Sequence, residues 1–350
     1  MSRLERLAWS TLLVAVAVVI GAARFVRPGQ AAPLEPFAAV AHAGSASFDA
    51  GASRNAFGAS REVRLRFALP ASDIEFPLEV TGDPGSLTYA WVSTHDTAAA
   101  SEARPLSGST FVAPPAPGFY RLAIMRGGER HIIGEPTLAV LVPFREKVGG
   151  VLNGYRIGTY LAERFGHHEH PAGFLEVNPS DVGLRISTHL RLGDFVTHDN
   201  QSDVWPKYVA LSPRILDKLE LVLAKIGGRA ALSAPVGDGE LPDGDRRSAS
   251  VADVAFDVHS GFRTPAHNGG VWRAARDSRH EYGDAADVAI DADGDGRVTL
   301  HDELLVARAV DQVEQEHPDL VGGLGLYTSR HYRTPYVHID ARGKRSRWKG

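Results

Sequence analysis

The stretch that decides the fold reads Ser278-Arg279-His280-Glu281-Tyr282-Gly283-Asp284-Ala285-Ala286-Asp287. It places a histidine and a carboxylate on either side of two small residues, Gly283 and Ala285. The chain contains no cysteine, so histidines and carboxylates must hold any transition metal. Taken alone, His280 would be read as a surface or satisfied core histidine. The spacing of the whole stretch makes it a candidate ligand.

This stretch resembles the Ser-x-His-x-x-Gly-x-Ala-x-Asp motif of the zinc D-alanyl-D-alanine carboxypeptidase family, which has the hedgehog/DD-peptidase fold. At average residue usage, such a match arises by chance on the order of once per million start positions. The resemblance spans roughly residues 175–345 and includes residues 260–263, which are similar to the family's Ser-Gly-Tyr-Arg turn. It is closest to the periplasmic branch ending in His-x-Asp-x-Arg. The matching residues are Ser278, His280, Gly283, Ala285, Asp287, His338, Asp340 and Arg342.

The resemblance implies that His280, Asp287 and His338 bind a zinc ion. Hydrolytic zinc sites take three ligands from histidines and carboxylates and leave a fourth position for water. Two histidines and one aspartate meet this count and leave the complex positively charged. The metal can then lower the pKa of its water and polarise a scissile carbonyl. The small residues Gly283 and Ala285 suit a turn that brings two ligands onto one ion.

The motif does not identify the residue that takes the proton from the zinc-bound water. Several branches of the family carry a base shortly before the last histidine ligand, but residues 335–337 here are Pro, Tyr and Val. Side chains alternate along a strand, so Tyr336, His338 and Asp340 are expected to face the metal together. Asp340 is a candidate for the base, for a carboxylate that orients His338, or for a plain structural residue. His331 is another candidate base.

Arg263 and Ser278 complete the predicted zinc site. The resemblance implies that Arg263 holds a carboxylate or carbonyl of the substrate, which suits the two-pronged guanidinium group. The alternative is a solvated arginine in a turn. Ser278 is expected to hold its loop by hydrogen bonding and not to act as a nucleophile.

A second candidate metal site follows four residues after Asp287. The carboxylates and the glycine of this stretch match the calcium-loop template, in which a backbone carbonyl supplies the ligand at position 7. An aspartate at position 12 and a strand-like run before the loop depart from the template. One structural calcium ion is expected, against an acidic turn that binds nothing. The predicted ligands are Asp291, Asp293, Asp295, Arg297 through its backbone, and Asp302.

Two regions of different pattern make up most of the chain. Alternating runs separated by turns over residues 59–143 predict a small antiparallel β-sandwich, immunoglobulin-like in strand count, with a spacer or docking role. Residues 144–350 mix helices and strands without βαβ alternation, which predicts an α+β domain with the hedgehog/DD-peptidase-like fold. Helices are expected over 212–226 and 301–316, and strands over 255–258 and 336–340.

The N-terminus is typical of an exported protein. Arg3 and Arg6 precede an apolar run over residues 7–23 that is short for a full membrane span. Residues 1–30 are interpreted as a cleaved signal peptide or a retained membrane anchor, with a buried core helix as the alternative. Residues 31–58 are expected to be a linker. The rest of the chain would then work in the periplasm or at the cell surface, in contact with the membrane if the segment is uncleaved.

The charge and composition of the chain argue against nucleic acid as a binding partner. The chain has 38 basic and 42 acidic residues and a net charge of −4, so no positive field exists to hold nucleic acid. The leading hypothesis is a zinc D,D-carboxypeptidase or endopeptidase that acts on peptidoglycan stem peptides. The main alternative is a non-catalytic, zinc-containing protein that binds or scaffolds the cell wall. A third hypothesis makes the β-sandwich the functional module.

Overall fold

The computed structural model describes residues 38–41, 58–76, 78–81, 87–108, 110–126, 129–166, 169–226, 256–328 and 334–350. Residues Ala38–Gly350 form one compact unit, apart from Met1–Phe37. The predicted signal or anchor over residues 1–30, most of the predicted linker, and His331 lie outside the described residues. None of the helices in the described part of the chain is long and apolar enough to cross a membrane.

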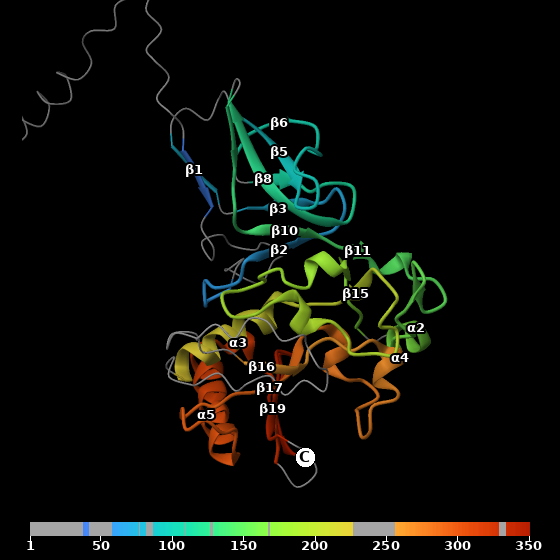
Figure 1. Ribbon diagram of the computed structural model, residues 1–350, viewed down its shortest axis with the longest axis vertical. Helices are drawn as coiled ribbons and strands as arrows, with labels where there is room; N and C mark the ends of the chain where they lie inside the picture. Colours follow the sequence, from blue (N-terminus) through green and yellow to red (C-terminus); the bar gives the residue numbers. More distant parts are fainter. Residues whose placement is uncertain are drawn as a thin grey trace, which may run out of the picture. The chain divides into compact units, whose positions relative to one another are not determined.

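The chain has the predicted α+β class, and the described elements before residue 141 are all strands (Figure 1). A six-stranded sheet has the order β2-β10-β8-β5-β6, with β9 paired to β8, and β3 pairs with β7. Trp91 of β5 joins these sheets, because its ring packs edge-on against Phe76 and Phe111. The strands are β2 (Leu65–Ala68), β3 (Asp73–Glu75), β5 (Thr88–Ser93), β6 (Arg104–Pro105), β7 (Thr110–Val112), β8 (Gly118–Arg126), β9 (Glu129–Ile132) and β10 (Thr137–Val140).

This region departs from the expected antiparallel pattern in one pair. Strand β10 runs parallel to β2, with Thr137 opposite Leu65. The first and last strands of the sheet are therefore neighbours, and alternation within each strand could not reveal that pairing. Strand β1 (Ala38–Ala41), within the stretch expected to be a linker, pairs with β4 (Leu78–Thr81).

The C-terminal part is organised around a five-stranded sheet with the order β16-β17-β19-β18-β20. Neighbouring strands are antiparallel except β18 and β20, which are parallel. Short turns of 3-10 helix, including η5 (Arg279–Tyr282), connect the elements. The strands are β16 (Asp257–Ser260), β17 (Ala285–Ala289), β18 (Gly323–Tyr327), β19 (Tyr336–Asp340) and β20 (Ser346–Lys349).

Two helices, α3 (Pro213–Ile226) and α5 (Leu300–Glu316), lie side by side (Figure 1). Both predicted helices are thus confirmed. Helix α3 starts at a proline, whose missing N–H costs nothing in the first turn. Helix α5 starts with a capping box, in which Thr299 and Asp302 satisfy each other's backbone N–H groups. Their facing sides bury apolar residues at helical spacing: Ile215, Leu216, Leu219, Val222, Val306, Val310 and Val313.

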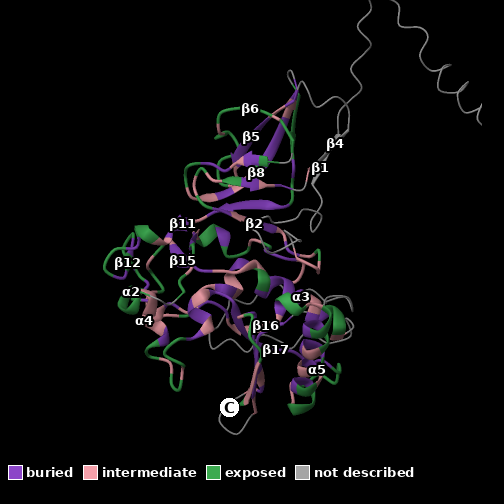
Figure 2. Cartoon of the chain, turned by 180° about the vertical axis from the view of Figure 1, so that it is seen from behind, coloured by how far each residue is buried: buried purple, intermediate pink, exposed green. Residues whose placement is uncertain are grey.

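One buried hydrophobic cluster includes residues of both regions. Val63 and Phe119 from the β-rich region belong to the same buried cluster as Leu216 and Ile339. The N–H of Arg64 also donates to the carbonyl of Ile186 at 2.9 Å. Figure 2 shows buried residues in β8 of the β-rich region and in β17 of the α+β part. The remaining elements are β11 (Val142–Pro143), β12 (Val151–Leu152), β13 (Tyr155–Arg156), α2 (Leu161–Phe165), β14 (Gly173–Val177), β15 (Lys207–Val209) and α4 (Pro265–Asn268), with η2 (Phe144–Glu146), η3 (Pro179–Asp181), η4 (Leu192–Phe195) and η6 (Pro318–Leu320).

Candidate metal centre

The predicted triad comes together on one face of the five-stranded sheet. Asp287 of β17 lies directly opposite His338 of β19 in the antiparallel ladder. Directly opposed residues point to the same face, so this register brings carboxylate and imidazole together. The η5 turn adds His280 from just before β17. All three residues are buried, and together they could hold a metal ion.

The three facing atoms form a triangle of the right size for a metal. His280 Nε2 lies 3.2 Å from Asp287 Oδ1 and 3.1 Å from His338 Nδ1. His338 Nδ1 lies 2.8 Å from the same Asp287 oxygen. Tetrahedral ligands about 2.0–2.1 Å from zinc lie about 3.3–3.4 Å apart, so an ion would need only a few tenths of an ångström of expansion.

The hydrogen bonds on the far side of each imidazole make this triangle unusual. His280 Nδ1 lies 2.6 Å from the carbonyl oxygen of Gly261, which can only accept, so we infer that Nδ1 carries the proton. His338 Nε2 lies 3.1 Å from Asp340, which places the other ring's proton there. With neutral rings, both remaining nitrogens and the Asp287 oxygen direct lone pairs at one another. Such a group requires a cation, either an extra proton or a metal ion.

The proton affinities of the triad reflect the same crowding. Burial lowers the pKa of His280. Burial acts against the charge of Asp287, yet His280 and His338 hold the pKa of that carboxyl well below its usual range. For His338, hydrogen bonds to Asp287 and Asp340 outweigh burial and raise the pKa. In the metal-free site, His338 is therefore the group that holds an extra proton most readily.

Gly283 closes the turn between the first two ligands. Its φ of +69° lies in the left-handed region. A Cβ atom there would lie 2.1 Å from the carbonyl oxygen of Ala210, and the Gly283 carbonyl accepts from Ser212 N at 2.8 Å. The expectation that a small residue is needed where backbone meets backbone is confirmed here. Ser278 holds the turn by a hydrogen bond, as expected, but through its carbonyl, which accepts from Glu281 N at 2.9 Å; its side chain makes no cap hydrogen bond.

Arg263 lies beside the triad, and its contacts are to the protein. Its Nε donates to Ser260 Oγ at 2.7 Å, and its Nη2 pairs with Asp287 Oδ2. Asp287 therefore offers one oxygen to the arginine and the other to the two histidines. The guanidinium group orients this ligand, and its side chain is 15% exposed, so one side of it remains open to solvent.

Asp340 lies behind His338, on the side of the ring away from the triangle. It is fully buried and accepts from His338 Nε2, from Gly323 N at 2.7 Å, and from Arg342. Although burial acts to raise it, the pKa of Asp340 is strongly lowered by the hydrogen bonds from His338 and Arg342. A carboxylate with these contacts holds the His338 ring in place.

His338 lies next to a connected group of aromatic rings, of which the sequence pattern indicated only Tyr336. Tyr336 lies on the expected strand, where it stacks on Tyr327 with centroids 4.6 Å apart. Trp348 of β20 lies 5.1 Å from the His338 ring and donates from Nε1 to Tyr327 OH at 2.9 Å. His259, whose ring lies 5.9 Å from Tyr336, is 3.2 Å from the Asp257 carboxylate. The alternation Asp257-x-His259 on a strand was the available signal for this pair.

The acidic loop brings part of its predicted ligand set together. Carboxylate oxygens of Asp291, Asp293 and Asp302 converge as a second group that could hold a metal ion. Asp291 accepts from the N–H groups of Gly294, Asp295 and Gly296, and the Asp295 carboxylate accepts from Arg297 N at 2.9 Å. Asp295 is outside the converging group. The loop leads from β17 directly into α5, as the strand-like run before it indicated.

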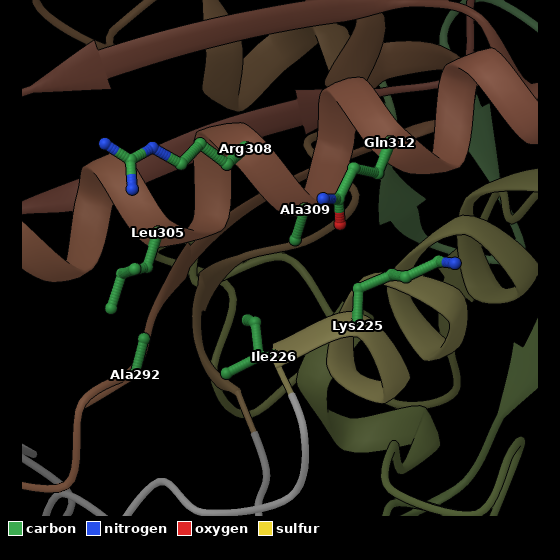
Figure 3. A pocket seen from close by; sticks show the side chains of 7 residues that line it. All are labelled: Lys225, Ile226, Ala292, Leu305, Arg308, Ala309 and Gln312. Carbon is green, nitrogen blue, oxygen red and sulfur yellow. The ribbon is translucent and has the colours of Figure 1, made fainter.

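A small pocket borders this loop (Figure 3). Its volume is about 210 Å³, and its lining includes Ala292 of the loop, Lys225 of α3 and Leu305 of α5. Ligand pockets are commonly about 300–1,000 Å³. The acidic carboxylates that converge in the loop are not part of its lining.

Comparison with known proteins adds no family to this picture. A scan against models of known protein families finds no match to this chain, and a search of curated proteins finds no significant match. The function of the centre must therefore be inferred from its own residues.

Proposed function

We propose that this chain is an exported zinc metallopeptidase that hydrolyses peptide bonds of D-amino acids in peptidoglycan, as a D,D-carboxypeptidase or endopeptidase. The observation that carries the proposal is the buried triangle of His280, Asp287 and His338, whose three facing atoms lie 2.8–3.2 Å from one another. Two imidazoles and one carboxylate suit zinc and leave a position for water. The motif resemblance supplies the substrate class.

The fit of the donor set assigns roles to the residues around the metal. Bound zinc would supply Lewis acidity, which activates a water and polarises the scissile carbonyl. Asp340 fixes the tautomer and angle of His338, and Arg263 fixes Asp287. Such outer contacts commonly maintain the affinity of a metal site. The open side of Arg263 is suited to a carbonyl or carboxylate of the peptide.

The geometry favours Asp340 as the orienting group over Asp340 as the base. Its oxygens already accept from four donor groups, and it lies across the ring from the metal-facing Nδ1. Tyr336 and His331 stay candidates for moving the proton. His259 joins them, because Asp257 holds one of its ring nitrogens and its ring lies beside Tyr336.

We also propose a domain type and a role for each part of the chain. Residues 144–350 would be the hedgehog/DD-peptidase-like domain, and residues 59–143 an immunoglobulin-like spacer. Residues 1–30 would direct export, as a cleaved signal or as an anchor. Calcium in the loop from Asp291 to Asp302 would stiffen the segment that follows β17.

The test combines metal content with activity. The full-length protein would be incubated with peptidoglycan and with stem peptides ending in D-Ala-D-Ala, with and without chelator, beside a His280→Ala variant. We expect about one zinc per chain, with release of D-alanine or opening of cross-links that chelator and the substitution both abolish. Folded protein that contains no zinc would contradict the proposal.

The alternative function is a wall-binding or scaffold protein in which zinc is structural. The observation that favours it is that the Asp340 carboxylate already accepts hydrogen bonds from Gly323 and Arg342, which makes it unsuited to act as a base. Bound zinc without cleavage of any wall peptide, together with co-sedimentation of the protein with peptidoglycan, would support this alternative.

A further inference from the structure

A larger pocket lies beside the metal centre, between α2, α4 with its following loop, and η5. Its volume is about 530 Å³, within the usual range for small ligands. Leu161, Phe165 and Val271 give it apolar walls. None of the three triad residues is part of its lining. It shares η5 with the metal centre, because its residue Glu281 directly follows the ligand His280.

Among the described residues, one buried side-chain atom at this pocket has no hydrogen-bond partner. The Nδ2 of Asn268 donates to the carbonyl of Ala275 at 2.9 Å and to Glu281 Oε1 at 2.6 Å. Both partners accept, so the orientation of the amide is fixed. Asn268 is only 4% exposed, and its Oδ1 is buried without a partner among the described residues. A buried acceptor in this state is stabilised by a ligand that brings a donor.

The charges of the pocket are arranged in two layers. Glu281 is buried next to Asn268, so the inner part offers oxygen acceptors. Arg164 and Arg276 are exposed and supply positive charge at the rim. Within the described part of the chain, neither arginine forms an ion pair. A simple anion would meet Glu281 inside, and a simple cation would meet two arginines at the entrance.

We propose that this pocket binds the end of an amino-acid side chain that carries both an ammonium and a carboxylate group. The ammonium donates to Asn268 Oδ1 and to the Glu281 carboxylate. The carboxylate of the same ligand binds Arg164 and Arg276, and its carbon stem lies against the apolar wall. The identification of this ligand with a diamino acid of a stem peptide rests on the proposed function.

The experiment is calorimetric titration of the full chain with two tripeptides that lack the bond cut by a D,D-peptidase. One is L-alanyl-γ-D-glutamyl-meso-diaminopimelate, whose side chain ends in both groups. The other has L-lysine at the third position and ends in an ammonium alone. Arg276→Ala and Glu281→Gln are compared with Arg145→Ala, which removes an exposed arginine that does not line the pocket.

The diaminopimelate peptide should bind about tenfold more tightly than the lysine peptide, because it alone has a charge-assisted bond to the rim. Arg276→Ala should reduce this difference because only Arg164 then remains at the rim, Glu281→Gln should weaken both peptides, and Arg145→Ala should change neither. Equal affinities in the unchanged protein, or a preference that Arg276→Ala leaves undiminished, would overturn the proposal. Peptide binding with this pattern but without zinc-dependent cleavage would support the pocket and contradict the peptidase. Zinc-dependent cleavage with no effect of Arg276→Ala on peptide binding would support the peptidase and contradict the proposed pocket.

Discussion

At the scale of single residues, each side chain of the candidate metal centre is fixed by a partner on its far side. Gly261 holds His280, Arg263 holds Asp287, and Asp340 holds His338. Arg342 in turn pairs with Asp340. The sequence motif indicated the ligands but only part of this outer layer, because partners such as the Gly261 carbonyl have no side-chain signature.

Replacing Asp340 by asparagine tests whether this residue orients His338. The amide has one acceptor oxygen in place of two and brings N–H groups toward existing donors, so the ring should lose its fixed orientation. We expect zinc affinity to fall about 10–100-fold, measured by competition with a chromogenic chelator. Asp319→Asn, at an exposed carboxylate, is the control. Unchanged zinc affinity with lost hydrolysis would assign Asp340 the role of base.

Glu281 predicts a pH-dependent stability. Burial raises its pKa from the ordinary value of 4.5 to about 7. The raised pKa means that the folded state favours the neutral acid over the carboxylate. The loss of unfolding free energy caused by Glu281 is therefore nearly zero below pH 4.5 and grows as the pH rises to about 7. Glu281→Gln should therefore stabilise the ligand-free protein by roughly 3 kcal/mol at pH 8 and by less than about 1 kcal/mol at pH 5.

Urea denaturation at these two pH values, in parallel for both proteins, measures the effect. A stabilisation equal at pH 5 and pH 8 would mean that the Glu281 carboxyl does not change its protonation in this range.

At the scale of elements, the helices and the last strand could be predicted because their patterns are local. Helix α3 shows apolar residues at helical spacing after Ser212-Pro213, and β19 alternates over Tyr336–Asp340. The parallel pairing of β2 with β10 and the position of β20 beside β18 could not be predicted, since pairing depends on contacts between distant residues. The aromatic group next to His338 includes Trp348 of β20, so its position could not be predicted from the sequence either.

The turn between η5 and β17 should be the element most sensitive to a single methyl group. Gly283→Ala forces a side chain into a left-handed conformation and against the Ala210 carbonyl. We expect a loss of at least about 1–3 kcal/mol of unfolding free energy, seen as a lower urea midpoint, together with weaker metal binding. Gly269→Ala is the matched control, because its backbone is helical and its nearest neighbour would be 3.6 Å away. Similar losses in both variants would contradict this account.

At the scale of the whole molecule, buried charges cross the core beneath the metal site. Lys218 of α3 is buried, pairs with Glu314 of α5 at 2.8 Å, and donates to the carbonyl of Asp340 at 2.7 Å. The two helices are therefore joined to the strand that carries His338. A pattern of apolar residues predicts that these helices pack, but the charged link is visible only in three dimensions.

The acidic loop lies at the start of α5, so calcium should stabilise the whole unit. Calcium at about one hundred times its dissociation constant is expected to add roughly 2.7 kcal/mol and to raise the unfolding temperature, followed by calorimetry. Asp291→Asn should remove this response, because Asp291 belongs to the converging carboxylates. Asp203→Asn, at an exposed carboxylate elsewhere, should leave it intact. An unfolding temperature that does not change with calcium would show that the loop is an acidic turn that binds no calcium.

The direct pairing of Asp287 with His338 has a practical value beyond the chemistry of the site. A slip of one residue between β17 and β19 would turn one of the two side chains to the other face and destroy the cluster. If the centre binds a metal as proposed, a preparation that contains the metal therefore has correctly aligned strands. For variants away from the candidate metal centre, such as Arg276→Ala, metal content per chain can therefore serve as a criterion of correct folding before any activity is measured.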